Sequence, residues 1–312
     1  MMNIISRAGS RQVELDRFEE GCWVNLCDPS EEEVRQVVAF FEIDPGFVTA
    51  ALDEEESAHI DLEDDGSLLV VVDTPIIQKD DDKNFSYVTI PMGIILCAKG
   101  MVTVCLKEAS ILEPFLSNRV RSFSTNKKTR FLLQILYRNA SKFLQYLKQI
   151  DKASNLVENE LHKSMKNREL IQMMRLEKSL VYFSTSLKSN EAVLEKLLRY
   201  RAITRYDEDE DLLEDVIIEN KQAIEMCTIY RDIMSGTMDA FASIISNNLN
   251  IVMKWLAVIT IVLSLPQIVF SLFGINTGMP WEGLPQGFWY VLALGGLSCV
   301  AGALWMWKKK MF

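Results

Sequence analysis

Two long uncharged stretches near the C-terminus constrain this chain more than any other feature. The first is Trp255–Phe273 and the second is Gly287–Trp307. A helix of about 20 apolar residues crosses the roughly 30 Å hydrocarbon core of a bilayer. Aromatic side chains lie near the ends of both stretches, where they settle at the headgroups. We therefore predict transmembrane helices at 250–273 and 287–307, joined by a loop at 274–286. A buried hairpin of a soluble core is the less favoured alternative.

Basic residues beside the two spans predict their orientation. Lys254 precedes the first span, Lys308, Lys309 and Lys310 follow the second, and the loop contains no Lys or Arg. Because positive residues stay on the cytoplasmic side, both ends of the hairpin face the cytoplasm and the loop faces outward. We expect a multi-pass protein of the cell (plasma) membrane with both termini in the cytoplasm, ending in a basic tail at 308–312.

Polar residues of the first span recur on one helix face. The spacing is four or three residues, which is the period of one side of a helix. We call this set the polar stripe, and extension toward the N-terminus adds two apolar members: it comprises Asn250, Met253, Leu256, Thr260, Ser264, Gln267 and Ser271. Lipid cannot satisfy polar groups, so the stripe faces either protein or water. It packs against the second span, or it lines a water-filled path that several copies of the chain enclose.

Charge and side-chain inventory exclude several classes of function. The net charge is -10, and removing the four lysines and one glutamate after Asn250 leaves -13 for the preceding part. Such an acidic body argues against a nucleic-acid partner and agrees with a divalent-cation environment. No nucleophile–base grouping, phosphate loop or metal cluster is evident, so we expect neither an enzyme nor a bound cofactor.

The region 1–127 mixes strands and helices. Strands are predicted at Trp23–Leu26, Ser67–Thr74, Tyr87–Cys97 and Met101–Leu106, with acidic or glycine-bearing turns between the last three. Ser30, followed three residues later by Glu33, predicts a capping box at a helix start. We expect an α+β domain: a small, mainly antiparallel sheet covered by helices.

From Lys128 onward the apolar period is helical. We predict an antiparallel pair of long helices over 128–206 and a stalk helix over 207–249. Because no proline occurs in the third stretch before Pro266, it should continue as one helix through the first span. Roughly sixty residues then make a rod of about 90 Å.

The residues from Tyr230 to Gly283 closely resemble the stalk end and first span of the CorA family of divalent-cation transporters. The positions that match are Arg231, Asp232, Ser235, Gly236, Asp239, Asn247, Asn250, Met253, Lys254, Gly274 and Asn276. The resemblance implies a homopentamer with a funnel-shaped cytoplasmic portion. It also implies that the polar stripe lines a central pore, with the second span in an outer ring.

The same resemblance implies roles for particular residues. Gly274, Ile275 and Asn276 form the selectivity filter, in which Asn276 binds the hydrated ion through its water shell. Glycine at 274 lets the backbone turn without a Cβ penalty. Met253 and Leu256 form a hydrophobic gate. Asp215 is a regulatory metal ligand at a subunit interface, facing acidic residues of Asp53–Glu56 or Asp61–Asp65 in the next copy.

One departure from the family pattern bears on the ion. The usual Gly-Met-Asn motif reads Gly274-Ile275-Asn276 here, which is similar to the zinc-associated ZntB branch. The first hypothesis is a passive Mg²⁺ channel of the CorA type, with Co²⁺ or Ni²⁺ as further ions. The second is a ZntB-like, proton-coupled zinc transporter. The third is a membrane-tethered sensor or scaffold without a pore.

Overall fold

The first third of the chain contains the strands of a mixed β-sheet in the computed structural model, which describes residues 1–8, 11–79, 85–120, 123–164, 167–200, 203, 206–274 and 286–309. Its spatial order is β2-β1-β3-β7-β6-β5-β4, and β3 and β7 form its parallel pair while the other neighbours are antiparallel. The strands are β1 (Met2–Ala8), β2 (Arg11–Glu14), β3 (Cys22–Cys27), β4 (His59–Leu62), β5 (Leu68–Lys79), β6 (Phe85–Cys97) and β7 (Gly100–Cys105). The predicted mainly antiparallel sheet is confirmed.

The sequence predicted β3, β5, β6 and β7 but missed β1, β2 and β4. In β1 the obstacle was Arg7, a charged residue that is 2 % exposed in the structure. Its guanidinium donates to Asn118 Oδ1 at 2.7 Å and to the Val120 carbonyl at 2.8 Å, and it lies over the Phe123 ring. These partners are more than a hundred residues away in sequence, so local pattern could not indicate a buried strand.

Helices cover both faces of the sheet. Helices α1 (Glu31–Phe41) and α2 (Pro45–Ala50) pack on one face, against residues such as Val24, Leu69 and Val71. The capping box is confirmed, since Ser30 Oγ accepts from Glu33 N and the Glu33 carboxylate accepts from Ser30 N. Because helices cover both faces of the sheet here, successive residues of β5 are buried on alternate faces, which explains the apolar run Leu68–Val72.

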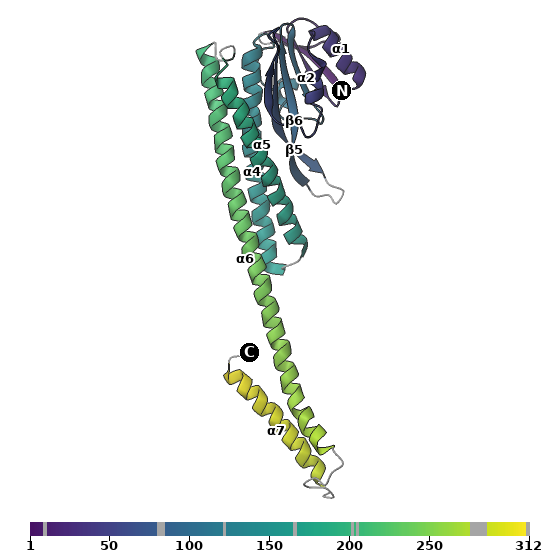
Figure 1. The fold of residues 1–312 in the computed structure, drawn as a ribbon, viewed down its shortest axis with the longest axis vertical. Helices are drawn as coiled ribbons and strands as arrows, with labels where there is room; N and C mark the ends of the chain where they lie inside the picture. Colours follow the sequence, from purple (N-terminus) through teal and green to yellow (C-terminus); the bar gives the residue numbers. More distant parts are fainter. Residues whose placement is uncertain are drawn as a thin grey trace. The chain divides into compact units, whose positions relative to one another are not determined.

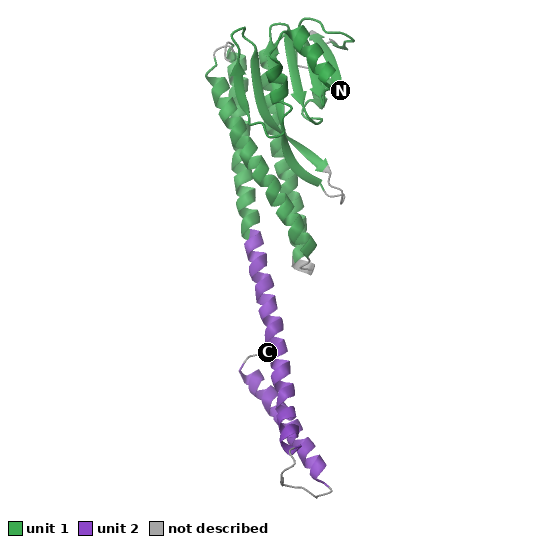
Figure 2. Ribbon diagram, turned by 45° about the vertical axis from the view of Figure 1, so that its right-hand side comes forward, with its two compact units in different colours: residues 1–236 green, residues 237–312 purple. Residues whose placement is uncertain are grey.

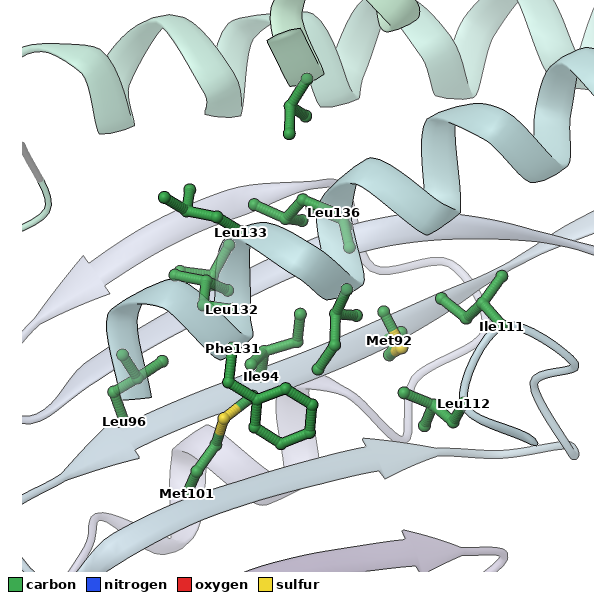
Figure 3. Close-up of a cluster of buried hydrophobic side chains, with 14 of the residues drawn as sticks. Met92, Ile94, Leu96, Met101, Ile111, Leu112, Phe131, Leu132, Leu133 and Leu136 are labelled. Atoms are coloured by element: carbon green, nitrogen blue, oxygen red, sulfur yellow. The ribbon is translucent and has the colours of Figure 1, made fainter. Parts of the chain in front are cut away.

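The opposite face carries the larger core. The short α3 (Glu113–Leu116), the long α4 (Lys128–Ser164) and α5 (Asn167–Leu198), and the first part of α6 (Asp207–Phe273) contribute to it. Figure 3 shows Phe131 and Leu132 of α4 beside Ile94 and Met101 of the sheet. The contacts Phe143–Phe183 and Ser154–Met173 run in opposite sequence directions, so α4 and α5 are antiparallel, as predicted.

Helix α5 ends eight residues before the predicted end at Tyr206. After Leu198 the backbone tightens, with Tyr200 N bonded to the Leu197 carbonyl and Ile203 N to the Tyr200 carbonyl. This turn places Ile203 in the core, at 3 % exposure. Ile203 thus packs in the core from outside the helix, whereas the apolar period alone predicted that the helix continues.

Helix α6 is a single helix of 67 residues that includes the first predicted span, and α7 (Gly287–Lys308) is the second (Figure 1). Both are long and apolar enough to cross a membrane. The chain divides into two compact units, Met1–Gly236 and Thr237–Phe312, which are coloured separately in Figure 2. The prediction of one helix from the stalk through the first span is confirmed.

Candidate functional site

Small residues let α7 approach the C-terminal part of α6 closely. A Cβ added to Gly295 would lie 2.5 Å from Cε1 of Phe270, and one added to Gly302 would collide with Leu265. Gly295, Cys299 and Ala303 stand four residues apart in α7, the spacing of one helix face. The structure has Gly295 buried and the other two half-buried, with Gly302 completing the close contact. Such small-residue contacts are the usual means by which membrane helices associate.

The polar stripe lies on the side of α6 away from this contact. At 3.6 residues per turn, each residue advances about 100° around the helix. Val258, Val262, Leu265 and Val269 therefore share the buried or half-buried side that α7 covers. Thr260 and Gln267 fall on the opposite side and are exposed. The alternative in which the stripe packs against the second span is thus not the arrangement that this unit has.

Exposure along the stripe supports the same conclusion. Six members are exposed and Ser264 is half-buried, the six being Asn250, Met253, Leu256, Thr260, Gln267 and Ser271. The two candidate gate residues, Met253 and Leu256, are 56 % and 57 % exposed. In a bilayer, a face with this many polar groups must meet water or another protein chain.

The hydroxyl groups of the stripe are satisfied within their own helix. Thr260 Oγ1 donates to the Leu256 carbonyl at 2.8 Å, and Ser264 Oγ donates to the Thr260 carbonyl at 2.7 Å. Their oxygen lone pairs stay available on the exposed side. Within the described part of the chain, the side chains of Asn250 and Gln267 have no hydrogen-bond partner. The stripe therefore presents acceptors and amides that the monomer does not use.

Of the predicted filter, only Gly274 belongs to the described residues; Ile275 and Asn276 lie outside them. Gly274 follows the end of α6, and its N–H donates to the Phe270 carbonyl at 3.0 Å. Its φ is not positive, and an added Cβ would be in ordinary contact 3.5 Å from the nearest atom. The backbone at Gly274 itself thus does not need the freedom of glycine, contrary to our expectation.

Asp215 is exposed on α6, between Leu213 and Val216, which are buried in the core. The acidic stretches that we expected to face it in a neighbouring copy make contacts within this chain, such as Glu54 with Lys107 at 3.2 Å. Glu56 and Asp61 flank His59, at 3.4 and 3.3 Å. Asp65 accepts bonds from Ser67 N and Oγ, which lower the pKa of its carboxyl. Among the described residues of this single chain, no group of three His, Cys, Asp or Glu side chains could hold a metal.

Comparison with known proteins places this geometry in a family. The model of the CorA-like Mg²⁺ transporter protein family matches residues 18–310. Cobalt/magnesium transport protein CorA of Methanocaldococcus jannaschii is 27% identical over 278 residues, which cover 87% of this chain and 85% of that protein. The protein with the same name in Thermotoga maritima is 27% identical over 171 residues, covering 53% and 47% of the two chains.

Solved structures share the fold. The complete CorA magnesium transporter of Methanocaldococcus jannaschii has a TM-score of 0.81 at 24% identity, over 97% of this chain and 96% of that one. The structure of full-length CmaX has a TM-score of 0.71 at 18% identity, over 99% of this chain and 96% of that one. The cytoplasmic domain of ZntB from Vibrio parahaemolyticus has a TM-score of 0.60 at 11% identity, over 80% of this chain and 97% of that one.

The family match includes both spans and nearly all of the N-terminal unit. The two apolar helices are therefore transmembrane helices of a plasma-membrane protein, the N-terminal unit is cytoplasmic, and the function is transport of divalent cations rather than enzymatic catalysis. From the matched residues and the shared fold together, the chain belongs to the CorA-like Mg²⁺ transporter family.

Proposed function

We propose that the protein is a homopentameric Mg²⁺ channel in which the polar stripe of each α6 lines a common water-filled path. The observation that carries this proposal is the position of α7, which covers the side of α6 opposite Thr260 and Gln267 and leaves the stripe uncovered. Two helices cannot enclose a pore. Several copies arranged about an axis give the stripe water on one side and keep its polar groups away from lipid.

The ion passes with its water shell. Mg²⁺ dehydrates reluctantly and prefers oxygen ligands. A ring of Asn276 side-chain oxygens, one from each copy, accepts hydrogen bonds from the waters of a hydrated cation, together with the Gly274 carbonyls. Neutral acceptors attract the ion and still release it, which conduction requires.

Met253 and Leu256 form the closed gate in this proposal. Their side chains project from the stripe at more than half exposure, between the polar Asn250 and Thr260. A ring of such apolar groups excludes water from a narrow pore and stops ions without a plug. Met253→Gly should then raise the resting leak of Mg²⁺ in flux recordings, and an unchanged closed state would discard this gate.

Asp215 supplies a regulatory contact in the proposal. It is an exposed carboxylate on the same helix as the stripe, and a divalent cation between it and a carboxylate of the next copy would offset their repulsion. Loss of the ion then loosens the ring, which opens the pore. Protease protection of the wild-type chain should rise with millimolar Mg²⁺, and Asp215→Asn should weaken this response.

Two observations favour Mg²⁺ over zinc. Two curated relatives are cobalt/magnesium transport proteins. The stripe contains amides, hydroxyls and one thioether but no His or Cys, a set that suits a hydrated hard ion. Ile275 is the feature that keeps proton-coupled zinc transport as the second candidate.

The decisive experiment is ion flux into liposomes at a set voltage, with Mg²⁺ or Zn²⁺ and with or without a proton gradient. The proposal expects voltage-driven Mg²⁺ uptake that is independent of the proton gradient and is lost in Asn276→Ala. The matched control is Leu297→Val, a 70 % exposed position on α7, which should transport as the wild type does. Zinc uptake that needs the proton gradient would select the second candidate. A monomeric protein that transports neither ion would support the third hypothesis, a membrane-tethered sensor or scaffold without a pore.

A further inference from the structure

Three buried asparagines gather where the helices meet the sheet. Asn139 of α4, Asn190 of α5 and Asn220 of α6 are each at most 3 % exposed. They lie beside apolar core residues such as Val72, Leu136 and Val216. Buried carboxamides normally have their polar atoms paired, because a buried donor or acceptor without a partner destabilises the folded state.

Most of their hydrogen bonds go to one residue of β5. Asn190 completes the edge of the strand beyond the end of β4: Asp73 N donates to Asn190 Oδ1 at 2.8 Å, and Asn190 Nδ2 donates to the Asp73 carbonyl at 2.9 Å. Asn139 Nδ2 donates to the same carbonyl at 2.8 Å. Asn220 Nδ2 donates to the Leu187 carbonyl at 3.1 Å, which links α6 to α5.

One acceptor of this cluster is left over. Asn139 Oδ1 is fully buried and has no hydrogen-bond partner among the residues that the structure describes. It belongs to the wall of a small cavity that the other two asparagines also line, and every residue of that wall is at most 3 % exposed. The cavity offers about 10 Å³ to a water-sized sphere, which is room for a single water molecule.

We propose that this cavity is a binding site for one structural water molecule. The water donates a hydrogen bond to Asn139 Oδ1 and meets the carboxamides of Asn190 and Asn220, which supply the two to four polar partners that a buried water requires. A metal ion does not fit, because Mg²⁺ demands six oxygen ligands at about 2.1 Å in octahedral geometry, and this wall is mostly apolar.

The site connects the pore helix to the cytoplasmic sheet. Asn220 stands on α6, and Asn139 is bonded to β5, so a water shared between them joins the two elements by exchangeable hydrogen bonds. Water-mediated bonds of this kind are nearly as favourable as direct ones. The shared water links α6 to β5 without requiring one fixed side-chain geometry.

A structure of the full-length protein at a resolution that shows ordered waters tests the proposal directly. We expect a density peak at about 2.5–3.0 Å from Asn139 Oδ1, inside the cavity. An empty cavity would overturn the proposal, and so would a rotated Asn139 whose Oδ1 accepts from a protein group.

A matched pair of variants gives an independent readout. Val72→Thr places a hydroxyl at the cavity wall without changing the side-chain volume, whereas Val70→Thr places one on the same strand in the dry core. The thermal unfolding midpoint of the full chain should fall clearly for Val70→Thr and less for Val72→Thr. The reason is that the water in the cavity can form a hydrogen bond with the Val72→Thr hydroxyl but cannot reach the Val70→Thr hydroxyl. Equal falls of the two midpoints would contradict a hydrated site.

Discussion

The two compact units use the same apolar residue types in opposite ways. In the first, the strand residues Leu69, Val70 and Val71 are at most 1 % exposed, and protein surrounds them. In the second, Leu263 and Leu297 are 65 % and 70 % exposed within the single chain, although both belong to helices that cross the membrane. Exposed apolar surface is a liability in water but the normal condition of a transmembrane helix.

Polar groups show the same contrast. In the first unit several buried polar groups are satisfied over long sequence separations, as Asn190 is by Asp73. In the second unit Thr260 and Ser264 are satisfied by their own helix, four residues back. Tertiary contacts therefore determine the cytoplasmic unit, whereas the transmembrane helices are largely complete before they associate. The following predictions test this difference, from the largest expected effect to the smallest.

The largest effect should come from a phenylalanine of the cytoplasmic core. Phe131 is 0 % exposed and contacts the rings of Trp23, Phe115 and Phe123. Phe131→Ala should lower the free energy of unfolding of this unit by about 3–5 kcal/mol, through lost burial and the cavity left behind. The matched control Phe288→Ala removes a ring that is 69 % exposed on α7. Equal destabilisation in chemical denaturation would refute the contrast.

Within the membrane unit, two adjacent glycines should differ. Gly295 lies against the Phe270 ring, whereas a Cβ at Gly296 would have nothing within 4 Å. Gly295→Leu should weaken the packing of α7 on α6 by about 1–3 kcal/mol, since the added side chain has no room. Gly296→Leu should be tolerated. Thermal stability of the detergent-solubilised protein measures both variants, and a larger loss at Gly296 would mean that α7 packs through its other face.

A glycine inside α6 should give a smaller effect of the opposite sign. Gly236 is exposed, and an added Cβ would meet nothing. Gly236→Ala should therefore stabilise the helix by about 1 kcal/mol, which is the propensity difference between the two residues. Gly93→Ala in β6 is the contrasting variant, because its Cβ would lie 2.6 Å from Ala51 Cβ and must destabilise. The unfolding midpoint should rise for the first variant and fall for the second.

The smallest effect should depend on pH. Burial raises the pKa of Asp73, and a hydrogen bond from Ser186 offsets part of that shift. Because the folded-state pKa is above the unfolded one, the charged carboxylate disfavours folding at neutral pH, and this penalty disappears below the unfolded value of about 3.9. Asp73→Asn should raise the unfolding midpoint at pH 7 but not near pH 3, below the unfolded pKa. A gain that is the same at both pH values would exclude burial of the charge as its cause.

Much of the fold and part of the candidate site followed from the sequence. The capping box at Ser30, the start of α4 at Lys128 and the uninterrupted α6 were predicted from local spacing. The four-and-three spacing of Thr260, Ser264 and Gln267 predicted that they share a face, because a helix fixes relative orientation along its own length. Their role in a pore, like the filter role of Asn276, stays a prediction.

The sequence could not show which way that face points or how the sheet is completed. The side of α6 that α7 covers depends on contacts of Gly295 with Phe270 and of Gly302 with Leu265. The strand β1 with its buried Arg7, the end of α5 at Leu198 and the asparagines around Asp73 depend on partners far along the chain. The spacing of polar and apolar residues along the chain is a local property, so it predicts helices and strands but not their distant partners. Only the tertiary structure decides which distant group fills a space or satisfies a polar atom.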